Sequence, residues 1–222
     1  MKRILISLIL TLMVVVTTFV ACKKESSDDY FVVDVQNVLG ETEGITTVKA
    51  TITYNIPATD EWETVTLSTA EFHDNGFIMQ LPSTLQRKYL EKVNLPNWIE
   101  VSDTNAKTSQ NISFSANNSS ETMGNFWLKG GDNYTWIDAR YIYADRDFTL
   151  KGNINIFEWN CTFTKGWNIM YYVDSLNDHT FTSVLITTQK PADTPVSWVF
   201  YPLIHIESQF QDPIFNHIAF YR

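Results

Sequence analysis

Hydrophobic and polar residues alternate with a period of two along most of the chain. Val48–Tyr54 is the clearest case, because Lys49, Thr51 and Thr53 separate its apolar positions. Successive side chains of a β-strand point to opposite faces of the sheet, so this pattern predicts strands with one buried face. The pattern recurs in Phe148–Ile156, Trp167–Val173, Phe181–Thr187, Val196–Phe200 and His217–Tyr221.

Short turn signals separate these segments. Asn75-Gly76 lies between Thr64–Phe72 and Phe77–Leu81, and both of its residues tolerate positive φ. Gly130–Asn133 divides two further apolar segments in the same way. We therefore expect β-hairpins at both places.

One short helix is expected over Thr84–Val93. Ser83 and Gln86 have the spacing of a capping box, and Leu85, Tyr89 and Val93 recur every four residues. The following segment, Asn94–Gln110, has no clear period and is expected to be irregular. A weak internal domain boundary is expected there, at 94–110.

The number of strands indicates the fold class. About ten to twelve short strands joined mostly by tight turns are typical of an antiparallel β-sandwich or a closed barrel. We predict one all-β domain over residues 30–222, a sandwich resembling immunoglobulin-like or transthyretin-like modules. A lipocalin-like β-barrel is the alternative.

The first residues have the pattern of a bacterial lipoprotein signal. Met1-Lys2-Arg3 is basic, Ile4–Val20 carries no charge, and Ala21-Cys22 ends the segment as a lipobox does, although Phe19 departs from the usual leucine. The expectation is a signal peptide over 1–21, with Cys22 carrying the lipid as the new N-terminus. Ordinary secretion and an uncleaved membrane anchor are the alternatives.

Residues 22–29 contain no apolar residue after the cysteine and are expected to form a flexible acidic tether. Lys23-Lys24-Glu25 followed by Ser26–Asp29 resembles the surface-export tether of Bacteroidetes lipoproteins. That resemblance implies attachment to the outer membrane through the lipid, possible exposure on the cell surface, and contact with a membrane as a partner.

Charge and cysteine content narrow the function. The chain has a formal net charge of −9, and losing Lys2 and Arg3 makes it two units more negative, which disfavours nucleic acid as a partner. No motif for a cofactor is present. Cys161 lies on the apolar face of its predicted strand and is expected to be a buried structural thiol.

The tryptophans are the candidate binding residues, because their rings stack on sugars and other flat ligands. Trp159 and Trp167 lie on apolar strand faces and are expected in the core. The candidates for exposure, each near a turn or loop, are Trp62, Trp98, Trp127 and Trp136.

Other constellations have weaker support. His205, Glu207 and His217 have the residue types of a metal site, but their apolar surroundings favour a structural role, and no metal is predicted. Asp145 and Asp147 could bind Ca²⁺ or act as an acid–base pair, but pairing with Arg140 or Arg146 at a strand corner is favoured.

Asp174-Ser175-Leu176 resembles the O-glycosylation acceptor of exported Bacteroidetes proteins, with Ser175 in a predicted loop. Residues 75–82, 143–152 and 165–169 together resemble uncharacterised exported lipoproteins of Bacteroides-type bacteria. The resemblance implies a cell-envelope habitat and no activity.

No catalytic motif is present, so we predict no catalytic residues. The hypothesis is a non-enzymatic lipoprotein that binds a ligand, most plausibly a glycan, or a protein partner. A structural subunit of an outer-membrane complex and a hydrolase are the alternatives.

Overall fold

The computed structural model describes residues 30–56, 58–118, 121–177, 180–192 and 194–203. Within these residues the chain forms fifteen strands and one 3-10 turn, which confirms the all-β prediction. No helix of this part of the chain is long and apolar enough to cross a membrane. The export segment, Cys22, the tether and the strand expected over His217–Tyr221 lie outside the described residues.

The strands form a two-stranded sheet and a much larger one. In the large sheet the order is β3-β2-β8-β9-β10-β13-β14-β12-β11-β6, while β15 pairs with β9, β7 with β10, and β5 with β7. The smaller sheet is β1 paired with β4. The strands are β1 (Tyr30–Val35), β2 (Thr47–Ile56), β3 (Glu61–Glu71), β4 (Phe77–Pro82), β5 (Leu90–Lys92), β6 (Ile99–Val101), β7 (Lys107–Ser109), β8 (Ile112–Asn117), β9 (Thr122–Gly131), β10 (Thr135–Ala144), β11 (Phe148–Ile154), β12 (Phe157–Phe163), β13 (Gly166–Asn177), β14 (Thr180–Thr187) and β15 (Val196–Pro202).

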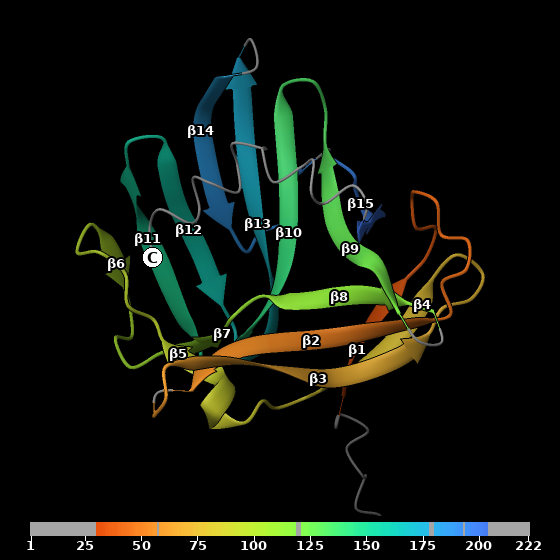
Figure 1. Ribbon diagram of the computed structural model, residues 1–222. Helices are drawn as coiled ribbons and strands as arrows, with labels where there is room; N and C mark the ends of the chain where they lie inside the picture. The colour runs from red at the N-terminus through yellow and green to blue at the C-terminus, as the bar shows by residue number, and fades with distance from the viewer. Residues whose placement is uncertain (1–29, 57, 119–120, 178–179, 193, 204–222) are drawn as a thin grey trace, which may run out of the picture.

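The two sheets pack face to face, as in a sandwich. The β1–β4 pair lies with β2 and β8 in the lower half of Figure 1, with β10 and β13 rising above them, and its side chains share the first core with residues of β9 and β15. Val35, Phe77 and Leu81 from the small sheet meet Phe114 and Trp198 from the large one. The path of the large sheet ends at β3 and β6 without closing, so the lipocalin-like barrel is wrong.

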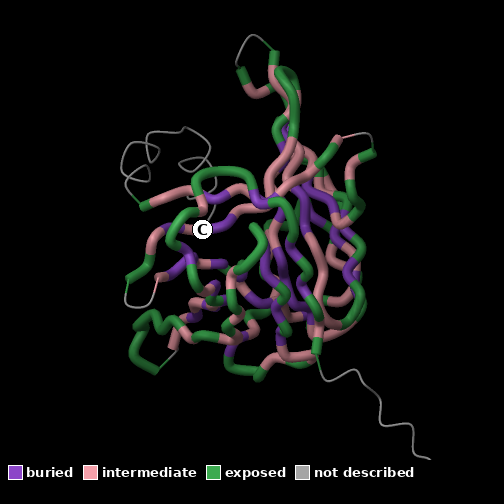
Figure 2. The backbone as a smooth tube through the Cα atoms, turned by 90° about the vertical axis from the view of Figure 1, so that its right-hand side faces the viewer, coloured by how far each residue is buried: buried purple, intermediate pink, exposed green. Residues whose placement is uncertain are grey.

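The paired strands β10 and β13 separate this first core from a second one. Tyr141 on β10 points into the first core, whereas Ile142 belongs to the second, with Met170 of β13. The second core continues over β11, β12 and β14 through Leu150 and Cys161. Figure 2 shows the buried positions concentrated in the body of the molecule and the exposed ones at its turns and hairpin ends.

The turn predicted at Asn75-Gly76 is present, but the hairpin is wrong. Asp74 and Asn75 both have positive φ, and His73 pairs with Gly76 in a single bridge. Beyond that bridge the strands part: β3 pairs with β2, while β4 crosses to β1. Alternate residues of β4, namely Phe77, Met79 and Leu81, are buried in the first core. This packing holds β4 in the two-stranded sheet with β1.

The helix expected over Thr84–Val93 is shorter than predicted. A 3-10 turn covers only Arg87–Tyr89, and strand β5 follows at once. The side chain of Gln86 makes no capping hydrogen bond, so the predicted capping box does not form. The segment expected to be irregular contains β6 and β7, which pair with β11 and β10.

Trp167 joins the two layers at the end of β13. Its indole Nε1 donates a hydrogen bond of 2.9 Å to the carbonyl oxygen of Pro82, and its ring packs against Phe31 and Tyr143. This half-buried ring lies against the first core, in agreement with its expected role.

Replacing Leu81 by alanine should destabilise the protein by about 2–5 kcal/mol, because its fully buried side chain fills the interface between the layers. Ile78, on the opposite face of the same strand, is 59% exposed, so Ile78→Ala is the matched control and should change stability by about 0.5 kcal/mol or less. Urea unfolding of both variants measures the difference. Equal effects would show that β4 does not pack as described.

Candidate functional site

A pocket of about 430 Å³ opens on the face of the large sheet that carries the second core. Strands β10 to β14 contribute its floor, and β6 with the segment before it contributes one end. Most lining side chains are aliphatic or aromatic, and the polar ones are Asp138, Asp174 and Thr180. A concave, mainly apolar cavity with a few polar groups is the usual form of a small-molecule site.

Among the described residues, the pocket is the open continuation of the second core. Ile99, Val184 and Ile186 belong to both, so one apolar surface passes from the packed region into the open one. Val93 and Ala106, which flank β6, pack on the second core without lining the pocket, while Leu95 does both. The apolar alternation of β12 and β14 therefore builds the core and the pocket wall together.

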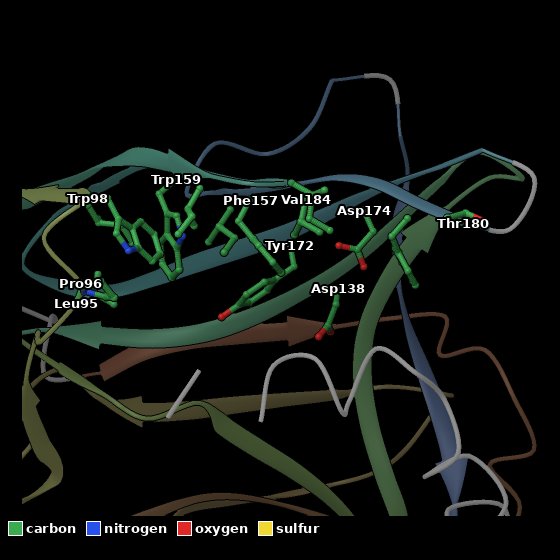
Figure 3. Close-up of a pocket in the computed structure, with 15 residues that line it drawn as sticks. Leu95, Pro96, Trp98, Asp138, Phe157, Trp159, Tyr172, Asp174, Thr180 and Val184 are labelled. Atoms are coloured by element: carbon green, nitrogen blue, oxygen red, sulfur yellow. The ribbon is translucent and has the colours of Figure 1, made fainter. Parts of the chain in front are cut away.

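Gly152 allows Trp98 to reach the pocket. It pairs with Ile99 across β11 and β6, and a Cβ at this position would lie 2.3 Å from the carbonyl oxygen of Trp98. Only glycine permits so close an approach of the two backbones. In Figure 3 Trp98 and Trp159 lie toward one end of the pocket, with Phe157 and Tyr172 beyond them.

The other end of the pocket holds charged groups. Asp138 and Arg140 lie two residues apart on β10, so their side chains share one face, and Asp174 lies on the neighbouring strand β13. Arg140 donates to the Oδ2 atom of Asp138 from Nε at 2.8 Å and lies 2.6 Å from it with Nη2. Its guanidinium is centred 4.8 Å from the centre of the Tyr172 ring.

Burial changes the protonation of these groups. Burial raises the pKa of Asp174 to about 6, and the nearby Asp138 carboxylate adds to this while Arg140 opposes it. Burial also raises the pKa of Tyr172 to about 12, so its hydroxyl stays neutral. Burial disfavours the charge of Arg140, but Asp138, Tyr172 and Asp174 outweigh this and raise the pKa of Arg140.

Of the tryptophans expected to be exposed, Trp98 alone lines this pocket. Trp127 and Trp136 do not line it, and the Nζ atom of Lys129 is 5.4 Å and 5.5 Å from their ring centres. Trp127 also lines a second cavity of about 300 Å³. Trp62 is 52% exposed on β3, away from both cavities.

Trp159 was expected in the core, and that prediction is wrong in part. Its ring packs on the second core but also lines the open pocket. The apolar face of β12 extends past the residues that cover the core, so alternation alone does not separate a core position from a pocket wall. From the sequence, Asp174 was named only as part of the Asp174-Ser175-Leu176 motif, not as a binding residue, although it occupies an inward-facing position of a strand.

The remaining candidates from the sequence do not line the pocket or lie outside the described residues. Cys161 is buried, burial raises the pKa of its thiol to about 12, and its Sγ lies 3.3 Å from the carbonyl oxygen of Ile186 as a donor. Ser175 lies within strand β13 and is only partly exposed, so the loop expected there is wrong. His205, Glu207 and His217 lie outside the described residues.

Asp145 and Asp147 support a strand corner, as favoured from the sequence. Asp145 pairs with Arg146 at 3.0 Å and accepts a hydrogen bond from the backbone of Lys107. Burial acts to raise the pKa of Asp145, but these hydrogen bonds outweigh it and lower the value. Asp147 accepts a 2.6 Å hydrogen bond from the backbone of Lys165.

Comparison with protein-family models, with curated proteins and with solved structures finds no match to this chain. Function must therefore be argued from the pocket itself. Two tryptophans and an apolar wall can hold a flat or aliphatic group, and the two carboxylates can accept hydrogen bonds or balance a positive charge.

Lowering the pH from 7 to 5 should stabilise the protein through Asp174. Its folded-state pKa is raised, so the folded protein holds this proton more tightly than the unfolded chain, and ionisation above pH 6 costs stability. Between pH 7 and pH 5 the gain is on the order of 1 kcal/mol, out of about 3 kcal/mol for the whole shift at 1.36 kcal/mol per pKa unit. Asp174→Asn should remove this stabilisation, as measured by the difference in melting temperature between pH 7 and pH 5.

The control for that experiment is Glu158→Gln, on the exposed face of β12. It should keep the wild-type change in melting temperature between pH 7 and pH 5. If Asp174→Asn also kept that change, Asp174 would not be the buried titrating group.

Proposed function

We propose that this chain is a lipid-anchored protein of the cell envelope that binds a small ligand in the pocket between Trp98 and Asp174, without catalysing a reaction on it. The observation that carries the proposal is the pocket: about 430 Å³ of apolar space that ends in two carboxylates. The lipoprotein signal at Cys22 supports the envelope location. The acidic net charge fits a partner other than nucleic acid.

The lining favours an amphiphilic molecule. Phe157, Ile154 and Val184 offer no hydrogen bonds from their side chains, and the polar groups gather at one end. Burying apolar ligand surface contributes about 25 cal/mol per Å². A molecule with an apolar body and one polar end matches this division better than one that is polar throughout.

A glycan remains the second candidate, because Trp98 and Trp159 both present ring surface to the pocket. Sugars stack their apolar faces on such rings and donate hydroxyl hydrogen bonds to carboxylates. A hydrolase would need two carboxylates that both reach the substrate. The Oδ1 atom of Asp138 is shielded and its Oδ2 atom pairs with Arg140, so this geometry favours binding over hydrolysis.

Lipid attachment is tested by metabolic labelling with an alkyne fatty acid. The wild-type chain should take up label and Cys22→Ser should not, because Cys161 is a buried thiol in both and cannot substitute for Cys22. In-gel fluorescence after click coupling measures the uptake. Equal labelling of the two chains, or none in either, would contradict the lipoprotein assignment.

Pocket binding is tested on residues 23–222, which contain every described strand. The neutral dye N-phenyl-1-naphthylamine fluoresces in apolar surroundings and should bind the pocket. Trp159→Ala and Trp98→Ala should each weaken binding by about tenfold, since losing one aromatic contact of about 1.4 kcal/mol corresponds to that factor.

The matched control is Trp62→Ala, which removes an exposed tryptophan away from the pocket and should leave dye affinity unchanged. Competition by a panel of neutral and charged oligosaccharides then separates the glycan candidate from the amphiphile. Dye affinity that none of the pocket variants alters would contradict binding at this site.

A further inference from the structure

The carboxylate of Asp174 has an unusual environment. The residue is only 8% exposed, yet no described group donates a hydrogen bond to it. The Oδ1 atom of Asp138 is also shielded from solvent and accepts no hydrogen bond from the described residues. A buried carboxylate without a hydrogen-bond donor is costly, and Asp174 lines the pocket, so this carboxylate points to a group that the protein itself does not supply.

The charges at this end of the pocket do not balance. Arg140 neutralises Asp138 through Oδ2, which leaves Asp174 uncompensated. Arg140 lies over the ring of Tyr172 and makes its hydrogen bond to Asp138, while its charge lowers the pKa of Asp174 only in part. Ionised, the three groups carry one net negative charge beside an apolar wall.

We propose that the ligand is an organic amine whose protonated nitrogen lies against the carboxylate of Asp174, with its apolar body along Phe157 and Trp159 toward Trp98. This inference rests on the proposed function of the same pocket. An ammonium group brings up to three N–H donors and one positive charge, which together give Asp174 a hydrogen-bond donor and a counter-charge. Figure 3 shows the two carboxylates at the same end of the pocket, with the aromatic side chains extending away from them.

Other ligand classes fit less well. An anion would be repelled by Asp174 and Asp138. A divalent cation needs several oxygen ligands, and the described residues contain no group of three or more His, Cys, Asp or Glu side chains that could hold one. A neutral alcohol could donate one hydrogen bond but would leave the charge of Asp174 uncompensated.

The proton on Asp174 competes with such a ligand. The groups that face this carboxylate are Asp138 and Arg140 on β10 and Tyr172 on its own strand, while β14 presents Val184 and Thr180. Lys129 of β9 lies over the aromatic rings beside the pocket. Because the pKa of Asp174 is about 6, the site is mostly ionised at pH 7 and mostly protonated at pH 5.

The experiment compares 2-phenylethylamine with 2-phenylethanol, which have the same apolar body and differ in charge. Both are titrated into residues 23–222 by calorimetry and by displacement of the naphthylamine dye. At pH 7 the amine should bind at least about tenfold more tightly than the alcohol, which corresponds to 1.4 kcal/mol. In Asp174→Asn this preference should disappear, whereas Glu158→Gln should keep it.

Acidification supplies a test that needs no variant. Between pH 7 and pH 5 the affinity for the amine should fall about tenfold, since the ionised fraction of Asp174 falls by about that factor while an alkylamine stays protonated. The affinity for the alcohol should not change. Because this pH comparison uses the wild-type chain, it tests the amine inference even if Asp174→Asn fails to fold.

The outcomes separate this inference from the proposed function. If the amine and the alcohol bind equally, or if Asp174→Asn keeps the preference, the amine inference is overturned while dye binding still supports the pocket. If the dye binds but neither 2-phenylethylamine nor 2-phenylethanol does, the amine inference is also overturned. Dye binding that is insensitive to Trp98→Ala and Trp159→Ala overturns both.

Discussion

The antiparallel pairing of β10 with β13 is the constraint on which the rest of the structure depends. Alternate side chains of this pair point to opposite faces, so Tyr141 enters the first core while Ile142 enters the second. A slip of one residue would exchange the two sets, moving Asp138 and Arg140 into the first core and Tyr141 into the pocket. The register of one strand pair thus sets both the packing and the position of the charged groups.

The charged end of the pocket lowers the stability of the folded chain. A buried aspartate without a hydrogen-bond donor lowers the stability of the folded chain, and a neutral residue of similar shape would fit the same strand position. Such costs are concentrated at functional sites, because binding needs groups that remain unsatisfied until the ligand arrives. This makes Asp174 more informative about function than the exposed aromatic residues.

Much of the fold could be predicted from alternation alone. The strands near Val48, Phe148, Trp167 and Phe181 follow it, because each buries one face of a sheet. Strand pairing could not be predicted in the same way: the Asn75-Gly76 turn was correct, but burial of the apolar face of β4 placed that strand against β1. Local turn chemistry does not reveal which distant strand offers the better packed surface.

The pocket was harder to predict than the sheet. Trp159 and Val184 have the alternation of core residues, yet both also form part of the pocket wall. The position of Trp98 depends on the close approach of its backbone to Gly152, a residue far from it in sequence. Asp174 could have been suspected, because it occupies a strand position in phase with Met170 and Tyr172, where an apolar residue is expected.

The strand order has a consequence for how the molecule acquires its shape. Strand β14 lies between β13 and β12 and is parallel to β12, so β12 and β13 never pair although they are consecutive. The edge of β12 that faces β13 therefore stays unpaired until β14, which comes later in the chain, adds between the two strands. Contacts between distant segments slow folding, because the loop must close before they form. The wall of the pocket that β14 supplies therefore forms late, and so does the first core, because Trp198 and Phe200 of β15 come later still in the chain.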